Sequence, residues 1–224
     1  MSRTGSSTKE ARMILAALGD INGNFAALDA VLGAIGEGGI HTVLCTGNAV
    51  AGDSAVNAVV ESLRSHDILC VQGEDDRRLV RFSRKQGRPA RYLPPEKQAA
   101  VARAWEAIRS THLEFLRCLP RRRRVAIDGI PILLCHGAPS SPSELLSEQT
   151  PLVRLQRQRE AEPAAIIICG GAPRPFSRMV DGTLFVGPGF VDEAPGRACY
   201  TLVSTEEEPW KASVHYVEYP WQAG

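Results

Sequence analysis

Apolar residues in the first third of the chain follow two patterns, which are short continuous runs and longer stretches with helical spacing. The runs cover residues 13–18, 42–45 and 68–71, and each ends at a polar turn that contains glycine. Residues 24–35 and 54–64 carry apolar positions three or four apart, which is typical of helices. A buried run followed by a polar turn is typical of an inner strand. The order strand, helix, strand, helix, strand predicts an α/β fold.

The middle of the chain is basic and contains prolines. Residues 77–95 predict a loop or cap, and residues 97–116 predict one long helix. Together they give a basic loop and helical cap at about residues 77–117. Residues 1–12 are polar and predict a disordered tail, which leaves residues 13–224 as a single domain.

The second half of the chain is rich in short apolar runs, and two Asp-Gly pairs mark hairpin turns. Two sheets packed face to face are therefore expected. A further helix is predicted over residues 145–158. The predicted strands cover residues 124–127, 130–135, 164–169, 178–180, 184–186, 200–204 and 212–219.

Composition narrows the class of protein without identifying it. The chain has 224 residues, of which 44% are hydrophobic and 23% charged, as expected for a globular domain. A net charge of +1 gives no overall field toward nucleic acid or membrane. No apolar run is long enough to cross a bilayer, and the N-terminus lacks the apolar segment of a signal peptide. We expect a cytoplasmic protein without membrane contact, and buried free thiols rather than disulfides.

Ligands of open α/β sheets bind beyond the carboxyl ends of the strands, and six polar blocks lie there. This series resembles the calcineurin-like metallophosphoesterases, and in particular the small bacterial phosphodiesterases, whose blocks read SDIHGN, GD, GNHD, HG, GHTHRP and NPGS. The resemblance implies a four-layer αββα sandwich of two packed mixed β-sheets flanked by helices. The blocks of this chain read GDINGN (19–24), GN (47–48), GEDD (73–76), HGAP (136–139), GGAPRP (170–175) and GPG (187–189).

The metal ligands that the resemblance implies are mostly replaced. Asp20 and His136 are identical to the family pattern, whereas every other ligand position differs. The replacements are Asn22 for a His, Asn48 for the Asp that bridges both metals, Glu74 for an Asn, Gly171 and Pro173 for two His, and Gly187 for an Asn; Asp75 stands at the catalytic His position.

These replacements remove the chemistry of a two-metal centre. A bridging carboxylate offsets the repulsion between two cations, and the neutral amide of Asn48 cannot do so because its nitrogen is a donor. Gly171 and Pro173 offer no ligand atom. Asp75 lacks the proton that a leaving group needs at neutral pH. We therefore expect a catalytically inactive or strongly impaired phosphoesterase.

Two alternatives remain open for the residual polar residues. Asp20, Asn22, Asn48, Glu74 and His136 would converge in this fold, and their oxygen-rich set suits a single Mn, Mg or Ca ion. An active phosphoesterase with a rebuilt single-metal site is therefore one alternative. In the other, Asp20 caps a turn and His136 is a hydrogen-bonded loop histidine.

Basic residues suggest a third function, which is binding of a phosphate-containing ligand or, on weaker grounds, nucleic acid. Arg77 and Arg174 are the candidate anion contacts. The alternatives are that the stretch around Arg77 is a solvated basic loop and that Arg174 has a structural role. Residues 121–124 are four arginines, which we interpret as charges that protect an edge strand. The aromatic C-terminus predicts packing or a homo-oligomer contact.

Overall fold

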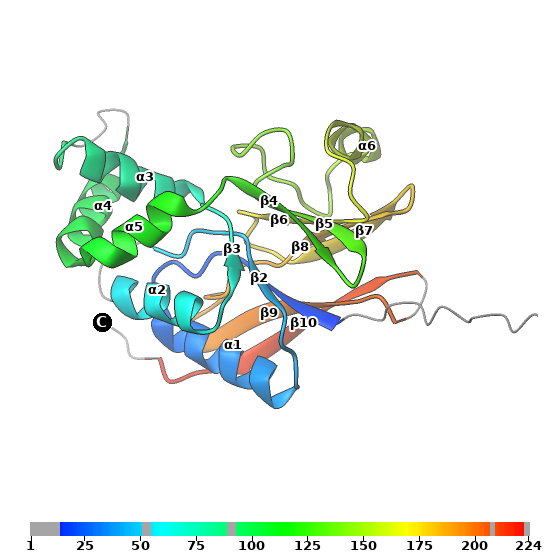
Figure 1. The fold of residues 1–224 in the computed structure, drawn as a ribbon, viewed down its shortest axis with the longest axis horizontal. Coiled ribbons are helices and arrows are strands. Elements are labelled where there is room, and N and C mark those ends of the chain that lie inside the picture. Colours follow the sequence, from blue (N-terminus) through cyan, green and yellow to red (C-terminus); the bar gives the residue numbers. More distant parts are fainter. Residues whose placement is uncertain (1–13, 51–54, 89–92, 207–208, 222–224) are drawn as a thin grey trace, which may run out of the picture.

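Two five-stranded β-sheets lie face to face in the computed structural model of the chain, which describes residues 14–50, 55–88, 93–206 and 209–221 (Figure 1). The first sheet has the order β10-β9-β1-β2-β3, and the second has the order β4-β5-β6-β8-β7. Both are mixed, because β1, β2 and β3 pair in parallel, as do β5, β6 and β8, while the other pairs are antiparallel. The strands are β1 (Ile14–Leu18), β2 (Val43–Cys45), β3 (Leu69–Cys70), β4 (Arg122–Ile127), β5 (Ile130–His136), β6 (Ile166–Gly170), β7 (Phe176–Val180), β8 (Thr183–Gly187), β9 (Arg197–Ser204) and β10 (Lys211–Glu218).

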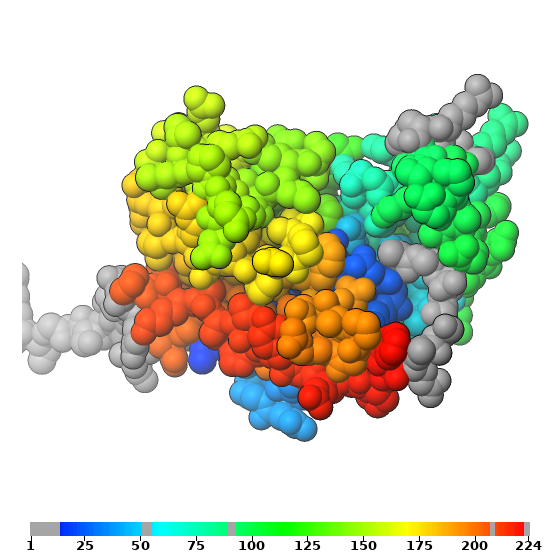
Figure 2. Space-filling model, turned by 180° about the vertical axis from the view of Figure 1, so that it is seen from behind, coloured from blue at the N-terminus to red at the C-terminus, as the bar shows by residue number. Residues whose placement is uncertain are grey.

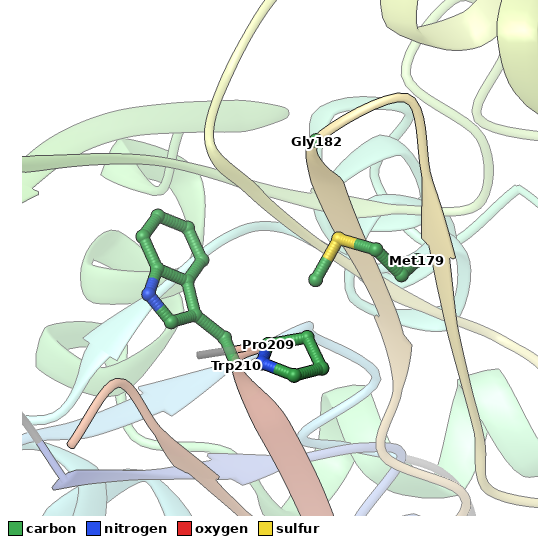
Figure 3. A pocket seen from close by; sticks show the side chains of 4 residues that line it. All are labelled: Met179, Gly182, Pro209 and Trp210. Atoms are coloured by element: carbon green, nitrogen blue, oxygen red, sulfur yellow. The ribbon is translucent and has the colours of Figure 1, made fainter. Parts of the chain in front are cut away.

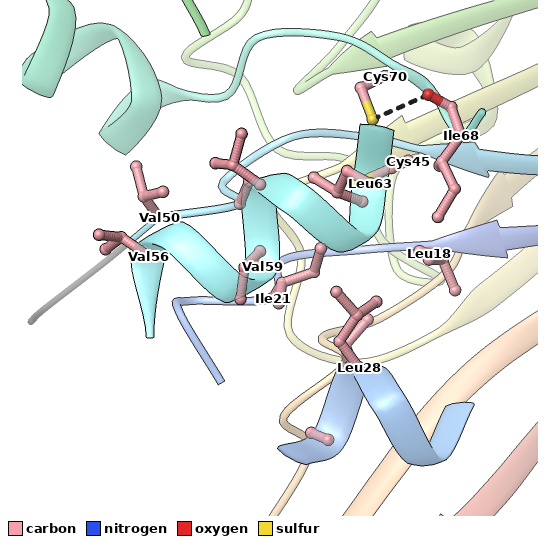
Figure 4. Packing of buried hydrophobic residues seen from close by; sticks show 14 of the residues in the cluster. Leu18, Ile21, Leu28, Cys45, Val50, Val56, Val59, Leu63, Ile68 and Cys70 are labelled. Atoms are coloured by element: carbon pink, nitrogen blue, oxygen red, sulfur yellow. Dashed lines mark hydrogen bonds between the residues drawn. The ribbon is translucent and has the colours of Figure 1, made fainter. Parts of the chain in front are cut away.

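Helices cover the outer faces of both sheets and complete four layers, as predicted. α1 (Phe25–Glu37) and α2 (Val56–Ser65) pack on the first sheet, and α6 (Leu152–Ala161) packs on the second. Figure 4 shows the packing under α1 and α2, where side chains such as Leu28 and Leu63 are buried. A separate apolar layer that includes Leu134 and Val186 fills the space between the sheets. Seen from behind, the C-terminal residues form much of one side of the molecule (Figure 2).

Three helices form a cap at one end of the sandwich (Figure 1). They are α3 (Glu74–Arg84), α4 (Pro95–Ala107) and α5 (Ser110–Cys118). Residues 77–84, for which a loop or a cap was expected, are helical and belong to this cap. Three acidic residues in the first turn of α3 and basic residues in its last turn complement the helix dipole, and Leu79, Val80 and Phe82 are buried together. Residues 89–92 of the predicted loop lie outside the described residues.

Two predicted helices also differ from the structure. The single helix expected over residues 97–116 is interrupted between α4 and α5, because Ile108 and Arg109 have extended backbone. The helix expected from residue 145 begins only at Leu152. Pro151 precedes it with extended backbone, and a proline disfavours helical backbone in the residue before it.

Other predictions are confirmed. The hairpin turns contain Asp128 and Asp181 with positive φ angles of 49° and 45°, a conformation that Asp tolerates better than most residues. β4 is an edge strand. The four cysteines that lie in apolar runs are buried free thiols, namely Cys45, Cys70, Cys135 and Cys169. None of the helices in the described ranges is long and apolar enough to cross a membrane. The predicted tail, residues 1–12, lies outside the described residues.

A buried histidine fastens the cap to the sandwich. The side chain of His112 in α5 is 2% exposed, with Nδ1 2.9 Å from Asn57 Oδ1 and Nε2 3.0 Å from Glu61 Oε2, both on α2. The amide of Asn57 is held in this orientation, because its oxygen accepts from the backbone N–H of Arg109 and its nitrogen donates to Ala107 O. The helix break at Arg109 therefore allows α5 to dock on α2.

Replacing His112 with alanine should lower the free energy of unfolding by about 1–3 kcal/mol, because two hydrogen bonds are lost and a cavity remains at a buried position. Urea denaturation followed by circular dichroism measures this. Arg117→Ala is the control, since it removes only an exposed ion pair with Glu114 in the same helix and should change stability by less than about 0.5 kcal/mol. Equal effects of the two substitutions would contradict this role of His112.

Candidate functional site

A cleft of about 500 Å³ opens where the ends of β1, β2, β5 and β6 meet the beginnings of α3 and α4. It gathers most of the polar residues that the sequence singled out. A second hollow lies between the β7–β8 turn and the start of β10 (Figure 3), but its described lining residues carry no acid, base or nucleophile. The cleft is therefore the candidate site. Its lining residues are Asp20, Asn22, Asn48, Glu74, Asp75, Arg78, Lys97, His136, Pro142, Ser143, Leu145, Gly171 and Phe190.

The side-chain amide of Asn48 occupies the middle of this constellation with a fixed orientation. Its Oδ1 accepts a hydrogen bond of 2.8 Å from the backbone N–H of Asp75, so the other end of the amide must be the nitrogen. That Nδ2 donates a 2.7 Å hydrogen bond to Asp20 Oδ2. A donor, not a ligand atom, thus faces the carboxylate of Asp20.

Asn22 is bound in a similar way. Its backbone is left-handed, with φ 54°, and its Nδ2 donates to Asp192 Oδ1 at 3.0 Å. Asp192 lies in the loop between β8 and β9, which the backbone bond from Val191 N to Asp20 O holds against the first block. Sequence reasoning missed Asp192 because it lies outside the six blocks and only the fold brings it to Asn22.

His136 keeps a free ligand atom in the cleft. Its Nδ1 donates to the backbone carbonyl of Thr46 at 3.0 Å, so in the neutral ring Nε2 carries the lone pair. Burial lowers the pKa of this imidazole, which favours that neutral form. His136 is 4% exposed, and its Nδ1 lies 3.9 Å from Asp20 Oδ1.

Two cationic side chains of the cap neutralise the third block. The guanidinium of Arg78 forms 2.5 Å contacts with Glu74 Oε1 and Asp75 Oδ1. The ammonium of Lys97, at the start of α4, lies 3.7 Å from Asp75 Oδ2. Lys97 could not be predicted as a site residue from the sequence, because it lies far from the third block along the chain.

The fifth block offers no side-chain ligand at Gly171, and the backbone there has little room for one. Gly171 has φ +82°, and a Cβ atom there would lie 2.7 Å from Leu145 Cδ2. Its backbone N–H donates to Asp20 Oδ1 at 3.3 Å. Leu145 thus fills space beside His136 where a side chain at position 171 would begin.

The two predicted anion contacts do not line the cleft. Arg174 is exposed, and Arg77 is half-buried on a different side of α3 from Arg78. The residues of the cleft do not fit a metal pair, and no group of three or more His, Cys, Asp or Glu side chains within the described ranges is arranged to hold a metal ion. Asp20 and His136 come together without a third such ligand.

Comparison with known proteins agrees with this fold. The calcineurin-like phosphoesterase superfamily domain matches residues 13–208. The chain belongs to this superfamily. An uncharacterized protein of Methanocaldococcus jannaschii, MJ0912, is 30% identical over 133 residues, which cover 58% of this chain and 52% of that protein. The match thus spans about half the length of this relative.

Two solved structures share the superfamily fold with this chain. The hypothetical protein PH1004 from Pyrococcus horikoshii OT3 has a TM-score of 0.79 at 22% identity, with 92% of this chain and 88% of that chain covered. A metallophosphoesterase from Sphaerobacter thermophilus has a TM-score of 0.72 at 20% identity, with coverage of 93% and 89%. At these identities the likeness shows the fold.

Three buried carboxyl groups lie in or beside the cleft, and each has a pKa raised to about 6 by burial. They are Asp20, Asp76 and Asp192. For Asp20, hydrogen bonds from Asn48 and Gly171 oppose the effect of burial. Asp76 accepts from the backbone N–H groups of Gly73 and Val50. In each case the folded chain holds its proton more tightly than an exposed carboxyl would.

We expect Asp20 to make the free energy of unfolding decrease as the pH rises from about 4 through about 6, because the folded state then binds a proton that the unfolded state has released. Asp20→Asn removes this titration. The stability of the variant relative to the wild type should increase by about 2–3 kcal/mol between about pH 4 and about pH 7. Urea denaturation at a series of pH values measures the difference.

Asp29→Asn, which removes an exposed carboxylate on α1, is the control for the change in net charge. A pH-independent difference between the Asp20 variant and the wild type would contradict a raised pKa at this position.

Proposed function

We propose that this chain is a non-hydrolytic member of the superfamily whose retained function is binding. The observation that carries the proposal is the orientation of Asn48. Its Nδ2 donates to Asp20 at 2.7 Å while its Oδ1 is engaged by Asp75 N. A hydrogen bond inside the protein therefore occupies the place where the family pattern has a carboxylate between two metals.

Charge balance in the cleft supports the same proposal. Two metals bring four positive charges, and acidic ligands are stable beside them. Here Arg78 and Lys97 contact Glu74 and Asp75, so cationic side chains neutralise these acidic residues of the third block. These ion pairs fix the beginning of α3 without a metal.

Acid catalysis also lacks a donor at the expected place. Asp75 stands at the position of the catalytic His, and its two carboxylate oxygens contact Arg78 and Lys97. A carboxylate in such an ion pair offers acceptors and no proton to a leaving group. Neither metal activation nor proton donation is therefore supported by these side chains.

The decisive measurement combines metal content with turnover. We expect protein purified in the presence of Mn²⁺ and then dialysed to contain far less than one metal ion per chain. We expect its rate on bis(p-nitrophenyl) phosphate with added Mn²⁺ to equal that of Asp20→Ala. One bound metal per chain, with turnover that Asp20→Ala abolishes, would instead support a single-metal phosphoesterase centred on Asp20 and His136.

Restoring a carboxylate at position 48 should be harmful in the absence of metal. Asn48→Asp places a second acid against the buried Asp20 and removes the donor between them, so we expect stability to fall by about 2–4 kcal/mol. The double variant Asp20→Asn/Asn48→Asp exchanges donor and acceptor and should recover at least half of this loss. Thermal and urea unfolding measure both effects.

The double variant is the matched control, because it contains the same new aspartate. If Asn48→Asp were as stable as the wild type without metal, the hydrogen bond to Asp20 would not be the element that replaces the metals.

A further inference from the structure

Two arginines lie on the first turns of α3 and two lie at the start of β4. We call Arg77, Arg81, Arg121 and Arg123 the arginine cluster. The chain is held together here by Gln72, whose backbone N–H donates to Pro120 O at 2.8 Å and whose Nε2 donates to Leu116 O at 2.7 Å. Burial lowers the pKa of Arg77, and the positive charges of Arg121 and Arg81 lower it further. The guanidinium groups of Arg121 and Arg81 therefore lie close enough to that of Arg77 to repel it.

Two members of the cluster carry buried donors without an acceptor. The Nε atoms of Arg77 and Arg123 are sealed from solvent and have no hydrogen-bond partner. Within the described ranges, no member of the cluster forms an ion pair. Buried polar groups in proteins are almost always hydrogen-bonded, and buried charges are paired. The Nε atoms of Arg77 and Arg123 are exceptions to the first rule.

The neighbouring arginines of the same strand behave differently. Arg122 and Arg124 both contact the carboxylate of Glu162 at the end of α6. Alternation along a strand sends these two side chains to the opposite face from Arg121 and Arg123. Protection of the edge strand is therefore provided by charges that have a partner, and it does not explain the buried donors of Arg77 and Arg123.

The dimensions and chemistry of the cluster fit a small anion. Arg77 and Arg81 are one helical turn apart, about 6 Å along α3, and Arg121 precedes β4 directly, two positions before Arg123. Guanidinium groups bind phosphate oxygens in bidentate geometry. The aromatic side chain nearest along α3, Phe82, is buried against Trp105 with a centroid distance of 5.4 Å and offers no face for base stacking. This favours a compact oxyanion over a nucleic acid strand.

We propose that the arginine cluster binds a compact phosphate-type oxyanion, either inorganic or carried by a small molecule. The site is separate from the lining of the cleft and requires neither metal nor hydrolysis. It assigns to Arg77 the anion contact expected from the sequence, but with Arg121 and Arg123 as its companions.

Isothermal titration calorimetry with pyrophosphate, inorganic phosphate and phenyl phosphate at about 50 mM salt tests the proposal. We expect saturable binding of at least one of them to the wild type, and an affinity at least about tenfold lower in Arg77→Gln/Arg123→Gln. The control is Arg122→Gln/Arg124→Gln, which removes the same charge from the same part of the chain and should change affinity less than about twofold. Comparison of the three compounds distinguishes an inorganic anion from a phosphate monoester.

Arg81→Gln/Arg121→Gln provides a second test if the first variant does not fold, because both side chains are exposed. It should also weaken binding severalfold. The proposal is overturned if none of the three compounds binds the wild type, or if the control weakens binding as much as the cluster variants do. It is also overturned if a single-stranded RNA oligonucleotide binds with steep salt dependence while all three compounds fail. None of these outcomes bears on hydrolysis in the cleft.

Discussion

The hydrogen bond from Asn48 to Asp20 joins the ends of two neighbouring parallel strands, β1 and β2, in the middle of the first sheet. The same amide accepts from the backbone of Asp75, so it also fixes the first turn of α3. Three loops that converge on the cleft thus depend on one neutral side chain. Loops at strand ends would otherwise carry unpaired backbone and carboxylate groups into a buried position, which is costly.

The rest of the cleft is consistent with that central bond. Asn22 binds Asp192, and Gly171 N contacts Asp20, so buried acids are met by uncharged donors. Nearer the surface, the cations Arg78 and Lys97 form ion pairs with Glu74 and Asp75. Uncharged donors compensate buried carboxylates only partly, and this is why burial still raises the pKa of Asp20 and Asp192 to about 6.

The sequence alone was sufficient to predict the strands, because continuous apolar runs and Asp-Gly turns are local patterns. It was less reliable for the cap. The basic residues of α3 left both a loop and a cap open, whereas its acidic first turn and the burial of Leu79 and Phe82 favour a helix. The break before α5 could not be predicted, because it depends on the contact of Arg109 with Asn57, 52 positions away.

The candidate site was predictable only as far as the six blocks extend. Asp20, Asn22, Asn48, Glu74, Asp75 and His136 do line one cleft. Lys97, Leu145 and Asp192 were not found, because each reaches the cleft from an element whose sequence carries no block. Lys97 contributes a charge, Leu145 fills space and Asp192 accepts a hydrogen bond. These roles arise from tertiary packing and leave no local sequence pattern.

The left-handed backbone at Gly171 has a consequence for how this member could change over time. A residue with a side chain is strained at φ +82° by about 1–2 kcal/mol, and Leu145 stands in its path. Histidine at position 171 would be disfavoured mainly by this backbone conformation, because the exposed side chain of Leu145 can move aside. Acquisition of an imidazole at position 171 would therefore carry an initial cost in stability.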